Sequence, residues 1–109
     1  MIKLVPNPKF TCRVDLSTPG EETTREIGIT FRHKTKDAVQ NWIDSAVNKS
    51  DVDVLAEVID SWSDVVSESG ESISYSPQAL ADLLQNYPAA HQEIFKKYLR
   101  ELTESKRKN

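Results

Sequence analysis

The spacing of apolar side chains changes once along the chain, near Thr35, and this change constrains the fold more than any other feature. Before Thr35 apolar residues recur at every second position, and after it they recur at every third or fourth position. A period of two places side chains on one face of a strand, whereas a period near 3.6 places them on one stripe of a helix. The sequence therefore predicts an α+β fold, with strands first and helices afterwards.

Two alternating segments near the start of the chain flank Pro19-Gly20, a dipeptide typical of turns. We predict a β-hairpin over residues 9–31 with one buried face. Two strands are only marginally stable alone, so we expect the hairpin to pack on helices or on a partner. The apolar residues expected on its buried face are Phe10, Cys12, Val14, Leu16, Ile27, Ile29 and Phe31.

Residues 35–102 are predicted to be helical, so that a bundle of about four helices follows the hairpin within a single domain, residues 1–109. Thr35 is expected to cap the first helix and Ser50 the second, since both can accept a hydrogen bond from a backbone N–H of the first turn. The apolar stripe of the second helix runs through Trp62 toward Val65.

The second half of the helical region is divided by a loop and a proline. Residues 66–75 are rich in Ser, Glu and Gly and predict a loop. Ser76-Pro77 is a strong start signal for a third helix. Pro88 separates this helix from the last one, and residues 103–109 are expected to be a flexible basic tail.

Charge is distributed unevenly along the chain, although the net charge is only -3. Residues 1–36 carry a net charge of +3, residues 37–95 carry -10, and residues 96–109 carry +4. The acidic total argues against a general polyanion binder. The basic, acidic, basic order instead favours oriented contacts with other proteins.

The residues that support metal binding or catalysis lack the required spacing. The two histidines, His33 and His91, fall in different predicted elements without a nearby cysteine pair, unlike the ligands of zinc sites. Cys12 falls on the buried face of a predicted strand, and the serines of the loop have no glycine elbow. The three glycines are isolated and form no phosphate-binding loop. We therefore expect no enzymatic activity, no metal and no cofactor.

The cellular compartment is constrained by the single cysteine and by the hydropathy of the chain. One cysteine cannot form an intrachain disulfide, which is compatible with a reducing cytoplasm. No apolar run is long enough to cross a membrane, and the first residues do not have the pattern of an export signal. We expect no membrane association.

Residues 77–102 predict a helix, a tight turn and a second helix, an order also found in helix-turn-helix proteins. A recognition helix contacts bases with its N-terminal residues. Here the cations Lys96, Lys97 and Arg100 come late, where they favour the negative end of the helix dipole. We expect no nucleic-acid binding, but a small nucleic-acid-binding regulator remains the alternative to a protein-interaction role.

The segment TFRHKTKDA, residues 30–38, joins the predicted hairpin to the first helix. Lys34 and Lys36 lie at the positive end of that helix, where cations are unfavourable. Their position against local helix preference suggests that they serve an external partner. Together with the cations of residues 96–100, such residues could attract acidic parts of a partner over a distance. The residues selected as partner-binding are Arg32, Lys34, Lys36, Lys96, Lys97 and Arg100.

Several stretches, in the same order, resemble tail assembly chaperones of long-tailed bacteriophages and prophages. These stretches are Leu4-Val5-Pro6-Asn7-Pro8, Phe31-Arg32-His33-Lys34, Asn86-Tyr87-Pro88 with Ile94-Phe95 and Tyr98-Leu99, and the basic end KRKN. The resemblance covers most of the chain apart from residues 61–75. None of these stretches is a catalytic signature.

The resemblance implies a non-enzymatic role in virion assembly. Members of this family bind the long, helical tape measure protein in the host cytoplasm and keep it soluble until tail tube subunits polymerise around it. They are absent from the mature virion. In many phages a programmed frameshift makes a longer form, whose extra domain would contact the tail tube protein. Because one chain is small beside such a client, we also expect several copies or a homo-oligomer.

Overall fold

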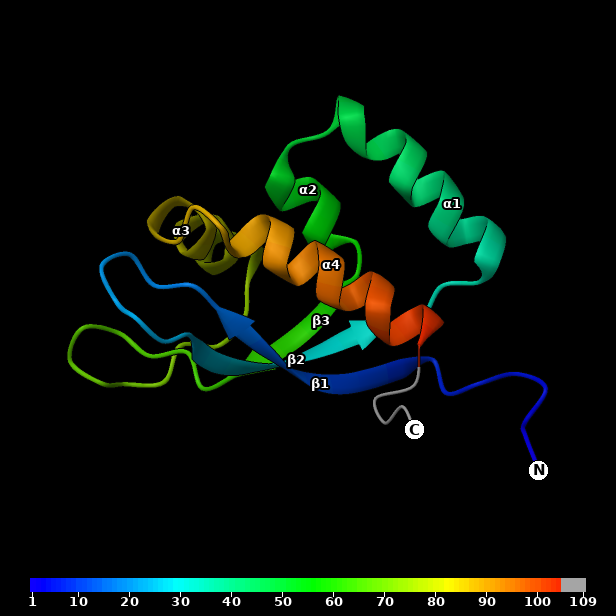
Figure 1. The fold of residues 1–109 in the computed structure, drawn as a ribbon, viewed down its shortest axis with the longest axis horizontal. Coiled ribbons are helices and arrows are strands. Elements are labelled where there is room, and N and C mark those ends of the chain that lie inside the picture. The colour runs from blue at the N-terminus through cyan, green and yellow to red at the C-terminus, as the bar shows by residue number, and fades with distance from the viewer. Residues whose placement is uncertain (105–109) are drawn as a thin grey trace.

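The structure is a computed structural model that describes residues 1–104, and it has the α+β architecture that the change of period predicts. All helices lie on one side of a three-stranded antiparallel sheet (Figure 1). The elements in chain order are β1 (Lys9–Leu16), β2 (Arg25–Arg32), α1 (Lys36–Ser45), the 3-10 turn η1 (Ala46–Asn48), α2 (Asp51–Ala56), β3 (Ile59–Ser63), α3 (Pro77–Asn86) and α4 (Ala90–Thr103). Thr103 ends α4, and most of the predicted tail, residues 105–109, lies outside the described residues.

The predicted hairpin is confirmed as β1 and β2, which pair in register with Cys12 opposite Ile29 and Val14 opposite Ile27. These four side chains are at most 7% exposed, because they face the helices. The other face of the sheet is polar and open to solvent. There the side chain of Arg13 contacts a carboxylate oxygen of Glu26 on the neighbouring strand at 2.9 Å.

The second helix ends earlier than its apolar stripe predicts, and the chain continues as a third strand. α2 stops at Ala56, and β3 pairs with β2 so that Trp62 lies opposite Ile29. The prediction of a helix through Trp62 toward Val65 was therefore wrong. β2 would otherwise carry an unpaired backbone edge, and β3 satisfies these N–H and C=O groups.

Each helix start that the sequence predicts from a capping residue is present. The backbone N–H of Ala38 donates to Thr35 Oγ1 at 3.2 Å, and that of Asp53 donates to Ser50 Oγ, also at 3.2 Å. Ser76 accepts from Ala79 in the same way, directly before Pro77. These contacts satisfy backbone donors that have no partner inside the helix.

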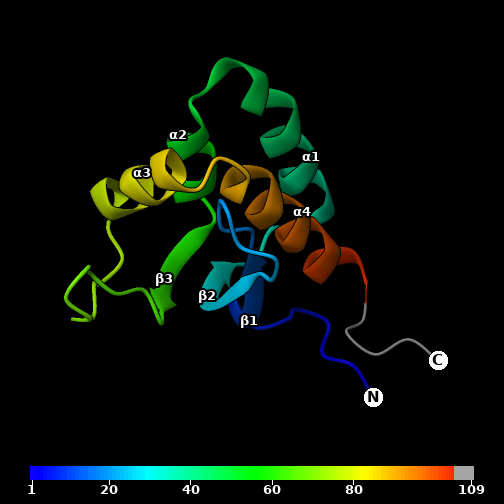
Figure 2. The ribbon, with the colours of Figure 1, turned by 60° about the vertical axis from the view of Figure 1, so that its left-hand side comes forward.

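α4 lies across the sheet and supplies the centre of the core (Figures 1 and 2). Tyr98 is fully buried and contacts the rings of Phe31 and Trp42, with centroids 5.0 and 5.2 Å apart respectively. Trp42 also stacks on Phe95 and so attaches α1 to α4. Beyond α1, in η1, Val47 is 85% exposed and lies outside this core.

Candidate functional site

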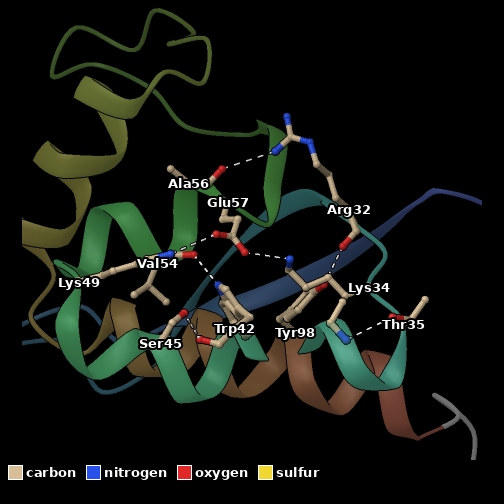
Figure 3. A network of polar contacts seen from close by, with 11 residues as sticks. Arg32, Lys34, Thr35, Trp42, Ser45, Lys49, Val54, Ala56, Glu57 and Tyr98 are labelled. Atoms are coloured by element: carbon tan, nitrogen blue, oxygen red, sulfur yellow. Dashed lines mark hydrogen bonds and ion pairs between the residues drawn. The ribbon is translucent and has the colours of Figure 1, made fainter. Parts of the chain in front are cut away.

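The junction between β2 and α1, which contains half of the predicted partner-binding residues, is held from below by α4 (Figure 3). The hydroxyl of Tyr98 donates to the backbone carbonyl oxygen of Arg32 at 2.7 Å. On the other side of Tyr98, the indole N–H of Trp42 donates to the carbonyl oxygen of Val54 at 3.0 Å. These bonds satisfy polar groups within the core and fix where β2 ends relative to α1 and α2.

Arg32 uses its guanidinium within the molecule. It donates to the carbonyl oxygen of Ile59 at 2.7 Å and contacts a carboxylate oxygen of Asp60 at 3.2 Å. Lys9 Nζ lies 3.2 Å from the same carboxylate oxygen. The side chain of Arg32 is still 46% exposed, so it anchors β3 with part of its surface left at the solvent.

Lys34 is also paired within the molecule. Its Nζ lies 2.8 Å from a carboxylate oxygen of Glu57, whose other oxygen lies 3.4 Å from Lys49 Nζ (Figure 3). The hydrogen bond from Lys34, followed by that from Lys49, lowers the pKa of Glu57 against the opposing effect of burial. Lys34 therefore neutralises a carboxylate just beyond α2.

Burial affects the phenol of Tyr98 in the opposite direction. Removal from water raises the pKa of Tyr98 to about 12, and the nearby charge of Glu57 adds to this effect. The neutral phenol is the form that donates to Arg32. The site thus combines a neutral donor inside the core with ion pairs at its surface.

The remaining predicted cations are more available. Lys36, Lys96 and Arg100 are exposed, and within residues 1–104 no carboxylate pairs with any of them. Lys97 lies 3.6 Å from Glu101, one turn further along α4. The structure thus divides the six predicted residues into three with partners in the molecule and three that are open to an external partner.

The helix-turn-helix-like segment contains α3 and α4, but the start of α4 is turned toward the hairpin. Ala90 and Ile94 are fully buried. Glu93, in the first turn, accepts hydrogen bonds from the backbone N–H of Ser17 at 2.9 Å and from its hydroxyl at 2.6 Å. The first turn, which a recognition helix would insert into a DNA groove, is therefore bound to Ser17, the residue that follows β1.

A second feature, an open groove of about 1000 Å³ at the far end of the sheet, was not predicted from the sequence. It lies between the start of β2, the segment after β3 and one side of α3, and five of its lining residues are acidic. Three of the groove acids, Asp64, Glu68 and Asp82, belong to the acidic segment 37–95. Because the third strand was not predicted, the sequence did not place them beside Glu21 and Glu26.

Two other kinds of feature are absent from residues 1–104, a metal-binding cluster and a membrane-spanning helix. No group of three or more His, Cys, Asp or Glu side chains there could hold a metal ion. None of the helices in that range is long and apolar enough to cross a membrane.

Comparison with known proteins agrees with the resemblance seen in the sequence. A family model described as phage tail assembly chaperone matches residues 1–109, the whole chain. Searches of curated proteins and of solved structures gave no significant match. The family match extends through the sheet, the helices and both candidate surfaces, and on this basis the chain belongs to the phage tail assembly chaperones.

Proposed function

We propose that the chain binds the tape measure protein of its phage, keeps it soluble and promotes tail tube assembly without catalysing a reaction. The observation that carries this proposal is the match of a tail assembly chaperone family to the whole chain. The geometry adds a surface on which a long helical client could lie.

This client-binding surface follows α1 and α4. Half-buried apolar side chains line it, and the exposed cations Lys36, Lys96 and Arg100 flank them. The apolar members are Val39, Ile43, Phe95, Leu99 and Leu102. In both ribbon views the start of α1 lies beside the C-terminal half of α4 (Figures 1 and 2). An amphipathic client helix would place its apolar face on this strip, in the manner of helix-in-groove recognition.

The cations give the surface its selectivity. Lys96 and Arg100 are four residues apart and therefore share one face of α4, next to the apolar positions Phe95 and Leu99. Such charges attract acidic parts of a client over a distance and orient it before contact. Arg32, Lys34 and Lys97 pair with carboxylates of the chain itself, so their charges add less to this attraction.

The remaining parts of the proposal rest on the resemblance to this family and on the small size of the chain. The chaperone acts in the host cytoplasm, is absent from the mature virion, and works as several copies on one client. A longer, frameshifted form would contact the tail tube protein. Purified virions should therefore contain the tape measure protein without this chain, which mass spectrometry of particles can measure.

Co-expression tests the function itself. The tape measure protein of the same phage, expressed alone, should be recovered mainly in the pellet, and co-expression with this chain should move it to the supernatant. A tape measure protein that is no more soluble with its partner than without it would contradict the proposal. Binding to duplex DNA that weakens steeply with salt would instead support the nucleic-acid alternative.

A further inference from the structure

The groove at the far end of the sheet is a second candidate binding surface, apart from the client-binding surface. Three segments form it: the start of β2, the segment after β3 and one side of α3. They lie together at one end of the molecule, at the left of Figure 1. α1 and the C-terminal half of α4 lie toward the other end in the same view. A segment bound in this groove could therefore leave the client-binding surface open.

Apolar side chains give the groove a lining that could take up part of another chain. Val66 is 55% exposed and Ile73 is 38% exposed, so both keep apolar surface that an occupant of the groove could cover. Their segment is held in place, since the indole N–H of Trp62 donates to the carbonyl oxygen of Ile73 at 2.8 Å. The apolar lining includes Ile27, Trp62, Val65, Val66, Ile73 and Leu83.

The acids of the groove are only partly neutralised. Arg25 pairs with Glu21, and Arg13 contacts both Glu26 and Asp64. Glu68 and Asp82 have no cation within ion-pair distance in the part of the chain that the structure describes. An occupant that combines apolar side chains with a cation would therefore match the groove in both respects.

Residues 1–8, which we name the arm, have this composition. Ile2, Leu4 and Val5 are 75% to 99% exposed, and Lys3 stands between them. The arm forms no helix or strand, and Lys3 donates only to the side chain of Asn7 within it. Removal of so large an apolar surface from water is favourable, so this short segment is expected to bind another surface.

The arm of one copy is poorly placed to fill the groove of the same copy. It is attached at Pro8, whose carbonyl oxygen accepts from the backbone N–H of His33 at 2.8 Å, at the end of the hairpin opposite to Arg25. Strand β1 separates these ends by about 23 Å. A fully extended arm spans at most about 25 Å, so only its tip would reach the groove.

We propose that the arm of one copy binds in the groove of a second copy, with Ile2 and Leu4 on the apolar lining and Lys3 beside Glu68 or Asp82. The two surfaces lie at opposite ends of the molecule, so each copy can donate one arm and accept another. This inference specifies the contact behind the several copies in the proposed function. It leaves the client-binding surface free.

Sedimentation velocity of the full chain over a range of concentrations tests the contact. The wild type should associate, and two variants should shift the association constant at least tenfold toward monomer. One variant, Ile2→Asp with Leu4→Asp, changes the arm, and the other, Glu68→Lys with Asp82→Lys, changes the groove. Val47→Asp, at an exposed apolar residue outside both surfaces, should associate like the wild type. Circular dichroism checks that each variant is folded.

A mixture of the two variants tests whether the arm of one copy binds the groove of another copy. The arm variant keeps an intact groove and the groove variant keeps an intact arm, so an equimolar mixture should recover association that neither shows alone. A labelled peptide of residues 1–8 should bind the arm variant, whereas a scrambled peptide should not.

A wild type that stays monomeric, or arm and groove variants that associate normally, would overturn the inference. So would groove variants that associate normally but no longer solubilise the tape measure protein, since the occupant would then be the client. A monomeric chain that still solubilises its client would contradict the arm contact alone and leave the proposed function standing.

Discussion

Tyr98 joins three parts of the fold at the residue scale. Its ring lies between Phe31 of the sheet and Trp42 of α1, and its hydroxyl donates to the last residue of β2. Because the ring is fully buried, the hydroxyl has no water as an alternative partner. This hydrogen bond inside the core therefore helps to fix the position of the cation-rich junction, together with the backbone bonds of Arg32 and His33.

Replacement of this residue by phenylalanine removes the bond and keeps the ring. Tyr98→Phe should lower the free energy of unfolding by about 1–2 kcal/mol, because the carbonyl oxygen of Arg32 loses its donor. Urea denaturation measures the change. Tyr87→Phe, at a half-buried tyrosine, is the matched control and should have a smaller effect. Equal losses in the two variants would contradict this role for the Tyr98 hydroxyl.

The same phenol makes stability depend on alkaline pH. The pKa of Tyr98 is about 12 in the folded protein, against about 10 for tyrosine in an unfolded chain. The folded state therefore holds the proton more tightly. Its contribution is fully present below pH ~10 and is lost as pH rises toward 12. The wild type should lose more stability than Tyr98→Phe across this range, and parallel curves would contradict the assignment.

At the scale of elements, the sequence predicts a helix or a strand correctly where contacts between residues close in the sequence decide the structure. Thr35, Ser50 and Ser76 cap helices because a hydroxyl near a free backbone N–H is a contact within a few residues. β3 could not be predicted in this way. Val58 and Ile59 are buried whether the segment is a helix or a strand, and the free edge of β2 decides between them.

One substitution in the first turn of α1 should change stability and client binding in opposite directions. Lys36→Glu places an acid at the positive end of the helix and should raise the free energy of unfolding by about 0.3–1 kcal/mol. It should nevertheless lower the recovery of soluble tape measure protein, because the surface loses a cation. Unfolding curves and co-expression measure the two effects.

Thr35→Ala provides the converse variant at the same turn. It removes the cap and should destabilise the protein by about 1 kcal/mol while the charge of the surface is kept. The amount of soluble tape measure protein should follow the charge of the surface in these two variants. If it followed their free energy of unfolding instead, this would contradict a role for Lys36 in binding.

At the scale of the whole molecule, the candidate site was only partly predictable. The six cations were selected from the sequence, and three of them, Lys36, Lys96 and Arg100, lie open at the surface. The ion pairs of Arg32 and Lys34 could not be predicted, because Asp60 and Glu57 come from distant positions that the third strand brings near. The acidic groove was missed for the same reason.

The client-binding surface and the acidic groove lie toward opposite ends of one small domain. The cations and apolar strip of α1 and α4 lie toward one end, and the acidic groove lies at the other. The acidic middle of the chain contains β3 and α3 and supplies three of the groove acids, Asp64, Glu68 and Asp82. A chaperone with such a distribution could hold a client on one surface and a neighbouring copy on the other.

The central claim is that the exposed cations of α1 and α4 bind the client. The most direct measurement is the fraction of soluble tape measure protein when it is co-expressed with a variant that carries Lys36→Gln, Lys96→Gln and Arg100→Gln. A control variant with Asn48→Asp, Gln78→Glu and Gln85→Glu changes the net charge equally at exposed positions outside that set of cations. We predict several-fold less soluble client with the first variant and wild-type recovery with the control. Equal recovery with both variants would contradict the claim.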